Sequence, residues 1–185
     1  LKDHAKMSAQ AAFRTKILFD TNQLLQRAKS EEEILSQTAS QLMKLLNRSL
    51  IVYPEQNGDL GSEQVFGIDG EVPCNIFSAP EERDAANWTF ANKKRSGAGT
   101  DSYPDAKGLY LALRTGGGVF GVIGIDLSEK PLDAFENSVL LSILGEGALA
   151  IENRRNALEK EQATVQAKNE ELRANLLRTI SHDLR

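Results

Sequence analysis

The sequence contains a single cysteine, Cys74, which excludes a disulfide within the chain. A redox cycle normally uses a second, resolving cysteine, so we expect Cys74 to be a small buried apolar residue rather than a reactive thiol. Histidine is also scarce, and no Cys and His residues cluster at the spacing of metal ligands. These absences predict a chain without a metal site, in a reducing, cytoplasmic setting.

The chain also lacks a strong excess of one charge, since it has 26 acidic and 22 basic residues and a net charge of −4. A dedicated nucleic-acid-binding protein carries a basic face, so we expect no nucleic-acid partner. No apolar run approaches the roughly 20 residues needed to cross a bilayer, and the start of the chain lacks a signal-peptide pattern. Because the chain begins with Leu1 instead of Met, we expect it to be a piece of a longer protein.

What is present suffices for one globular domain and an extended element, because 41% of the 185 residues are hydrophobic. Residues 6–28 carry apolar side chains at helical spacing. Ser30 followed by Glu33 is a capping-box signature for a second helix, from Glu31 to about Leu46. Pro80 predicts the start of a third helix that Gly97 terminates. Its acids come first and its bases last, which complements the helix dipole: Glu81, Glu82, Lys93, Lys94 and Arg95.

Strand signals lie between these helices. The apolar run 49–54 predicts a strand that Pro54 ends, and 62–69 predicts a strand that pairs with it. Residues 109–114 and 119–126 predict a hairpin around the three glycines 116–118, with Leu111 and Ile123 buried. The second hairpin strand is apolar on both faces, as expected of a sheet covered twice. Helices flanking a mostly antiparallel sheet make an α+β domain.

After Pro131 the sequence predicts a long helix, about 80 Å if all of 132–185 is helical. A heptad repeat places apolar residues at d and polar residues at a, which predicts a parallel homodimeric coiled coil along 144–176. The d residues are Ile151, Leu158, Val165 and Leu172, and the a residues include Arg155, Gln162 and Asn169. Two interpretations remain open: an inert dimerising stalk, or a marginal coil that changes register under a small bias. Beyond Leu172 the apolar stripe shifts phase, which leaves His182 off the stripe.

The stretch ISHDLR, 180–185, resembles the start of the phosphoacceptor box of sensor histidine kinases, whose pattern continues with Thr-Pro-Leu. The resemblance implies that His182 is the phosphoacceptor and that Asp183 orients it or acts as a general base. The reaction needs a neutral imidazole nitrogen exposed to the γ-phosphate of ATP, and a neighbouring carboxylate can hold the other ring nitrogen. The plainer interpretation is a solvated histidine on a helix, and the match after a heptad linker favours the kinase.

A second resemblance covers WTFANKKRSGAGTDSYPDAKGLYLAL, 88–113, and the first 35 residues, which are similar to the potassium-responsive Kdp sensor kinases. The match departs at DSYPDA, where that family more often shows Asp-Thr-Leu-Pro. The resemblance implies a GAF-like central antiparallel sheet flanked by helices, followed by a long coiled-coil helix. We therefore expect four parts: a juxtamembrane-type helix (1–29), a GAF-like sensor domain (30–130), a signalling linker (131–179) and the truncated phosphoacceptor box (180–185).

The function implied by this resemblance is regulatory. The chain is expected to be the cytoplasmic part of a bacterial inner-membrane two-component kinase that controls potassium-transport genes. Membrane helices would precede it, and an ATP-binding kinase domain, which takes ATP and Mg, would follow. The chain itself is expected to hold no cofactor and to be non-catalytic, with a second copy and a response regulator as partners. Four bases fit the cytoplasmic flank of a membrane helix: Lys2, Lys6, Arg14 and Lys16.

GAF domains commonly bind small molecules, so the resemblance also implies a candidate ligand pocket on the sheet. Its candidate residues are Trp88, Gly97, Gly99, Thr100, Asp101 and Tyr103. Glycines allow close backbone approach to a ligand, but Gly-x-Gly here lacks the strand-then-helix setting of a phosphate site, which favours packing and turn roles. Asn92-Lys93 matches only part of the cyclic-nucleotide motif of GAF domains, so we expect no cyclic nucleotide. The alternative function is a small-molecule-binding GAF domain whose helix only dimerises it.

Overall fold

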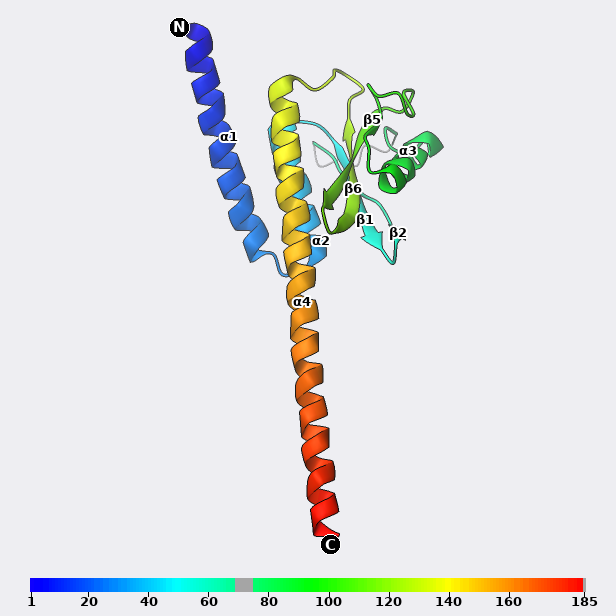
Figure 1. The fold of residues 1–185 in the computed structure, drawn as a ribbon. Coiled ribbons are helices and arrows are strands. Elements are labelled where there is room, and N and C mark those ends of the chain that lie inside the picture. The colour runs from blue at the N-terminus through cyan, green and yellow to red at the C-terminus, as the bar shows by residue number, and fades with distance from the viewer. Residues whose placement is uncertain (69–74, 185) are drawn as a thin grey trace. The chain divides into compact units, whose positions relative to one another are not determined.

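The structure is a computed structural model that describes residues 1–68 and 75–184. Cys74, predicted to be buried, and Arg185, the last residue of the kinase-like match, lie outside the described residues. Figure 1 labels the helices and most of the strands. The elements in chain order are α1 (Lys2–Arg27), α2 (Glu31–Leu46), β1 (Leu50–Gln56), β2 (Asp59–Leu60), β3 (Gln64–Phe66), α3 (Pro80–Asn92), β4 (Ser96–Gly97), β5 (Gly108–Thr115), β6 (Gly118–Asp126) and α4 (Ala134–Asp183).

The predicted starts of α2 and α3 are confirmed, whereas α1 begins at Lys2, earlier than the predicted residue 6. Ser30 caps α2, because its Oγ accepts a hydrogen bond from the Glu33 N–H at 3.1 Å, and the Glu33 carboxylate accepts one from the Lys29 N–H at 2.7 Å. Pro80 occupies the first turn of α3. The predicted end of α3 is wrong, however, because the helix stops at Asn92 and Lys93 adopts a left-handed conformation with φ 58°. The bases that follow therefore lie beyond the helix and do not complement its dipole.

The sheet is antiparallel, with strand order β2-β1-β6-β5-β4 and β3 paired to β1. The predicted hairpin is confirmed as β5 and β6, and Leu111 and Ile123 are buried partners across it. Pro54 does not end β1, which continues to Gln56. Its missing N–H is tolerated because Pro54 lies where the pairing of β1 changes: it is the last residue that pairs with β6, and on the other edge it lies between the residues paired with β3 and those paired with β2.

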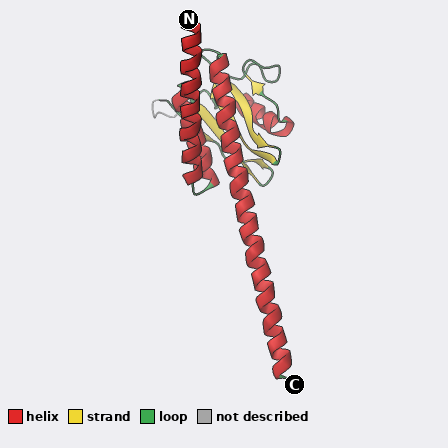
Figure 2. Ribbon diagram, turned by 60° about the vertical axis from the view of Figure 1, so that its left-hand side comes forward, coloured by secondary structure: helices red, strands yellow, loops and turns green. Residues whose placement is uncertain are grey.

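Helices cover both faces of the sheet, as Figure 2 shows. The larger core cluster joins α2 and α4 to one face and includes Ile123 and Ile125 of β6. The smaller cluster lies under α3 and includes Tyr53, Tyr110 and Val122. Alternate residues of β6 thus enter different cores, which explains why its sequence is apolar on both faces.

The helix α4 extends through two compact units, Leu1–Ile151 and Glu152–Arg185. By length and composition it meets the usual criteria for a membrane-spanning helix, although the sequence analysis expected no such run. Its buried residues lie between Val139 and Ile151 and belong to the core against the sheet, so core packing accounts for much of this apolar character. Alongside it runs α1, where the Phe13 and Phe135 rings are 6.5 Å apart.

Candidate functional site

The phosphoacceptor candidates lie at the end of α4. His182 and Asp183 are both exposed, and α4 ends at Asp183. Consecutive residues of a helix do not face each other, and neither side chain has a hydrogen-bond or ion-pair partner among the described residues. The helix therefore presents the His182 imidazole to solvent, where a phosphate donor could reach it, but Asp183 does not hold the ring in this arrangement.

The heptad positions of the second unit are solvent-exposed in the single chain. Leu158, Val165 and Leu172 are 42%, 54% and 62% exposed, and the shifted stripe is exposed too, at Leu177, Ile180 and Leu184. Ile151, assigned to the same stripe from the sequence, is fully buried in the core of the sheet domain. That assignment is wrong because the core of the first unit already buries the position, so the available stripe begins at Leu158.

The predicted pocket residues fall into two places. Trp88 is half-buried on α3, whereas the other five belong to the loop around β4. Thr100 folds this loop on itself, since its hydroxyl is 2.8 Å from both the Gly97 and Ser102 carbonyls. Asp101 and Tyr103 are exposed, and Gly99 and Thr100 line a pocket together with residues at the start of α4 such as Ala134 and Asn137.

Two of the loop glycines have backbone conformations that side chains rarely adopt. Gly97 has φ 93°, and an added Cβ would collide with the carbonyl oxygen of Gly108 on β5. Gly99 has φ 76° and open space around it. Turn geometry and close strand pairing therefore explain why glycine stands at these two positions.

Glu82, predicted from the sequence only as an acid near a helix start, is a structural centre of the domain. It is 2% exposed, and its carboxylate accepts hydrogen bonds from the Lys107 N–H at 2.6 Å, the Gly108 N–H at 3.1 Å and the Tyr110 hydroxyl at 2.5 Å. Burial raises the pKa of Tyr110 far above its ordinary value, and the hydrogen bond to Glu82 raises it further. No sequence motif signals this cluster, since its members come from α3 and β5.

Tyr53 lies in the same core, with the Arg83 guanidinium 4.8 Å from its ring centre. Burial is the main cause that raises the pKa of Tyr53 to about 12; Glu63 adds to the rise and Arg83 opposes it. The Glu82 carboxylate already accepts three hydrogen bonds, all from residues 107–110. This cluster therefore joins α3 to the sheet, and neither carboxylate oxygen is left to bind a substrate. In the described part of the chain, no group of three or more His, Cys, Asp or Glu residues could hold a metal ion.

Comparison with known proteins identifies relatives along almost the whole chain, although no family model matches it. The Sensor protein KdpD of Clostridium acetobutylicum is 34% identical over 173 residues, which is 93% of this chain and 19% of that protein. The Sensor protein KdpD of Escherichia coli is 26% identical over 98% of this chain and 20% of its own length. The chain thus spans about a fifth of the length of these curated relatives.

Solved structures show the same fold. The GAF domain of the potassium sensor histidine kinase KdpD from Escherichia coli aligns with a TM-score of 0.59 and 20% identity, over 82% of this chain and 99% of that one. The GAF domain of an Acinetobacter phosphoenolpyruvate-protein phosphotransferase aligns with a TM-score of 0.54 and 11% identity, over 78% and 95%. The predicted GAF-like α+β fold is confirmed. Taken with the sequence relatives, this identifies the chain as a GAF domain, followed by a long helix, that is similar to part of the KdpD sensor proteins.

Proposed function

We propose that this chain is the cytoplasmic regulatory domain and signalling helix of a membrane-anchored, potassium-responsive two-component sensor histidine kinase. The observation that carries the proposal is the 34% identity to a Sensor protein KdpD over 93% of the chain. The exposure of His182 near the end of α4 agrees with it. The name of the Escherichia coli structure supplies the link to potassium. The expected output is control of potassium-transport genes through a response regulator.

In the proposed reaction, a neutral nitrogen of the His182 imidazole attacks the γ-phosphorus of ATP. An N–P bond forms, the bond from the γ-phosphorus to the bridging oxygen breaks, and ADP leaves. The exposure of His182 on α4 supports this role. To accept a hydrogen bond from the second ring nitrogen, Asp183 would need another rotamer, or the last turn of α4 would need another conformation. ATP and Mg²⁺ are proposed to bind a separate kinase domain of the full-length protein.

A parallel homodimer along α4 is the proposed active form. Burial of Leu158, Val165 and Leu172 against a second copy would contribute roughly 1.5–3 kcal/mol per side chain. Gln162 and Asn169 at the intervening a positions reduce this gain, which keeps two packings of the coil close in free energy. A modest input from the GAF domain could then shift the coil from one packing to the other.

The membrane anchor is proposed to precede α1, which carries Lys2, Lys6, Arg14 and Lys16. The structure engages one of these four bases in packing, since Arg14 donates a hydrogen bond to the Ser142 hydroxyl at 3.0 Å. The other three are exposed and suit the negative surface of a cytoplasmic leaflet.

The decisive experiment compares the two histidines in the full-length protein. His182→Gln should abolish labelling by γ-labelled ATP, whereas His4→Gln, which changes an exposed histidine at the start of α1, should leave it intact. Label that persists on the His182→Gln protein would overturn the phosphoacceptor assignment.

The dimer is tested separately, by Leu158→Cys in a Cys74→Ser background. Oxidative crosslinking between copies is expected, because a d position of a parallel coil faces its own counterpart. Sedimentation as a monomer at high concentration, without crosslinking, would exclude the proposed coil.

A further inference from the structure

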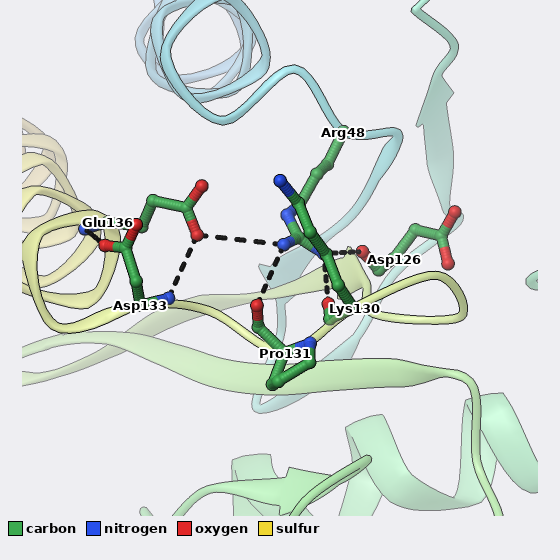
Figure 3. A network of polar contacts seen from close by, with 6 residues as sticks. All are labelled: Arg48, Asp126, Lys130, Pro131, Asp133 and Glu136. Carbon is green, nitrogen blue, oxygen red and sulfur yellow. Dashed lines mark hydrogen bonds and ion pairs between the residues drawn. The ribbon is translucent and has the colours of Figure 1, made fainter.

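Arg48 connects α2 to the segment that leads into α4, as Figure 3 shows. It is 6% exposed and directly follows Asn47, the left-handed residue that ends α2. Its Nη1 donates hydrogen bonds to the carbonyls of Asp126 at 3.1 Å and Lys130 at 2.6 Å, and its Nη2 donates to that of Pro131 at 3.1 Å. One side chain thus holds both ends of the connection between β6 and α4.

The same guanidinium also reaches the first turn of α4. Arg48 Nη2 is 3.7 Å from Oε2 of Glu136, which itself accepts a hydrogen bond from the Asp133 N–H at 3.1 Å. In return, the Asp133 carboxylate accepts one from the Glu136 N–H at 2.8 Å. This reciprocal pair is a capping box, so the carboxylate that starts α4 is also the ion-pair partner of Arg48.

A guanidinium suits this position better than any other cation. Its planar fork can serve several acceptors at fixed angles, whereas an ammonium is a compact point charge. A buried cation is costly unless it is paired and hydrogen-bonded, and three carbonyls with one carboxylate meet that demand. Nε is buried without a partner among the described residues, so Arg48 makes its hydrogen bonds and its ion pair only through Nη1 and Nη2.

We propose that Arg48 is a positioning residue that fixes the start and the rotation of α4 on the GAF domain, and so conveys the state of the sheet to the signalling helix. This inference rests on the proposed function. Because α4 is continuous from Ala134 to Asp183, a rotation or axial shift of its first turn would be passed along the helix that carries His182. Loss of Arg48 should therefore loosen this coupling without touching the reacting groups.

The chain offers a matched control in Arg83. It donates hydrogen bonds to the carbonyls of Leu60 and Gly61 and pairs with Glu63 at 3.3 Å, but it ties α3 to the strands and has no contact with the start of α4. Arg48→Met and Arg83→Met thus each remove an arginine that bridges two segments through carbonyls and one glutamate. Only the first removes a contact to the α4 cap.

Hydrogen exchange measured on the full-length protein gives the local test. In Arg48→Met, the amides of residues 133–137 should exchange about tenfold faster than in the parent, because the loop that leads into α4 loses its anchor. Arg83→Met should leave these amides unchanged. If Arg48→Met folds poorly, Glu136→Gln, which keeps the cap shape and removes the charge, should accelerate the same amides by less.

The response of the kinase to potassium distinguishes a positioning role from a role in stability alone. We define the response ratio as the autophosphorylation rate at low potassium divided by the rate at high potassium. Arg48→Met should reduce this ratio about fivefold, because the free energy that couples the GAF domain to α4 is lost. Arg48→Lys should restore part of the ratio, and Arg83→Met should not change it. Unchanged exchange at residues 133–137 together with an unchanged ratio would overturn the role of Arg48. Labelling of His182→Gln would instead overturn the proposed function, and the exchange result would still decide whether Arg48 anchors α4.

Discussion

The hydroxyl of Tyr110 lies 2.5 Å from Oε2 of Glu82, and both side chains are buried beneath α3. The same carboxylate accepts hydrogen bonds from the two backbone N–H groups at the start of β5. Hydrogen bonds to an ionised acceptor are stronger than neutral ones. Glu82 therefore fastens α3 to the sheet, and the chain's own carboxylate occupies the space between them.

Glu82→Ala should destabilise the domain by about 3–5 kcal/mol, because it strands a buried phenol and two buried N–H groups. Glu81→Ala is the matched control, since Glu81 is the exposed neighbour on the same turn and should change stability by less than about 0.5 kcal/mol. Urea unfolding followed by circular dichroism measures both. Equal stability of the two variants would contradict the anchoring role of Glu82.

Alkaline pH should unfold the domain through its buried tyrosines. The pKa of Tyr53 is raised from 10.0 to about 12 in the folded protein, mainly by burial, and the pKa of Tyr110 is raised further. The neutral phenols therefore contribute stability that is fully present below pH 10 and is lost as pH rises through the folded value. Thermal unfolding scans between pH 8 and pH 12 should show this loss in the parent and a smaller loss in Tyr53→Phe.

Two glycines should respond to alanine in opposite directions. A Cβ at Gly124 would collide with the Tyr110 ring and with Ile51, so Gly124→Ala should cost about 1–3 kcal/mol through overpacking. A Cβ at Gly145 meets nothing within 4 Å, and Gly145 lies inside α4, so Gly145→Ala should add about 0.5–1 kcal/mol. Differential scanning calorimetry compares them, and a stabilised Gly124→Ala would show that the core has room there.

Glu146 should weaken the domain when it is charged. Burial raises its pKa above the ordinary 4.5, against the opposing effect of a hydrogen bond with Asn22, and its Oε2 has no hydrogen-bond partner among the described residues. Its stabilising contribution is therefore present below pH 4.5 and lost as pH rises through the folded pKa.

Glu146→Gln should accordingly raise the melting temperature at pH 7, with the gain shrinking at pH 4, where the parent carboxyl is itself protonated. Glu159→Gln, at an exposed position of the same helix, is the control and should show no such pH dependence. A gain of equal size at both pH values would show that charge is not the cause.

The sequence predicted those parts of the fold that depend on neighbouring residues. The Ser30–Glu33 capping signature, the Pro80 helix start and the β5–β6 hairpin all arise from side chains or turns within a few residues of one another. Short-range geometry makes such signals readable. The pattern that begins at Leu158 was readable for the same reason, because helical periodicity is local.

Sequence-based predictions were wrong where residues far along the chain determine the local structure. Pro54 would end an isolated strand, but β1 continues through it because β6 pairs with β1 up to Pro54 and β2 pairs with the two residues that follow. Ile151 fits the heptad repeat, but it is buried in the hydrophobic core of the first unit. Periodicity identifies an apolar position and does not say which surface covers it.

By itself, the sequence determined the α+β class, the helix caps, the hairpin and the exposed helix that ends at the His182 segment. Only the tertiary structure decided what Glu82 and Arg48 do, because each is bonded to groups far along the chain: Glu82 to the start of β5, Arg48 to the start of α4. A charged side chain carries no sequence signal for burial. Folding removes water from such a side chain, and its role then depends on which carbonyls, amides or carboxylates the fold places close enough to replace the lost hydration.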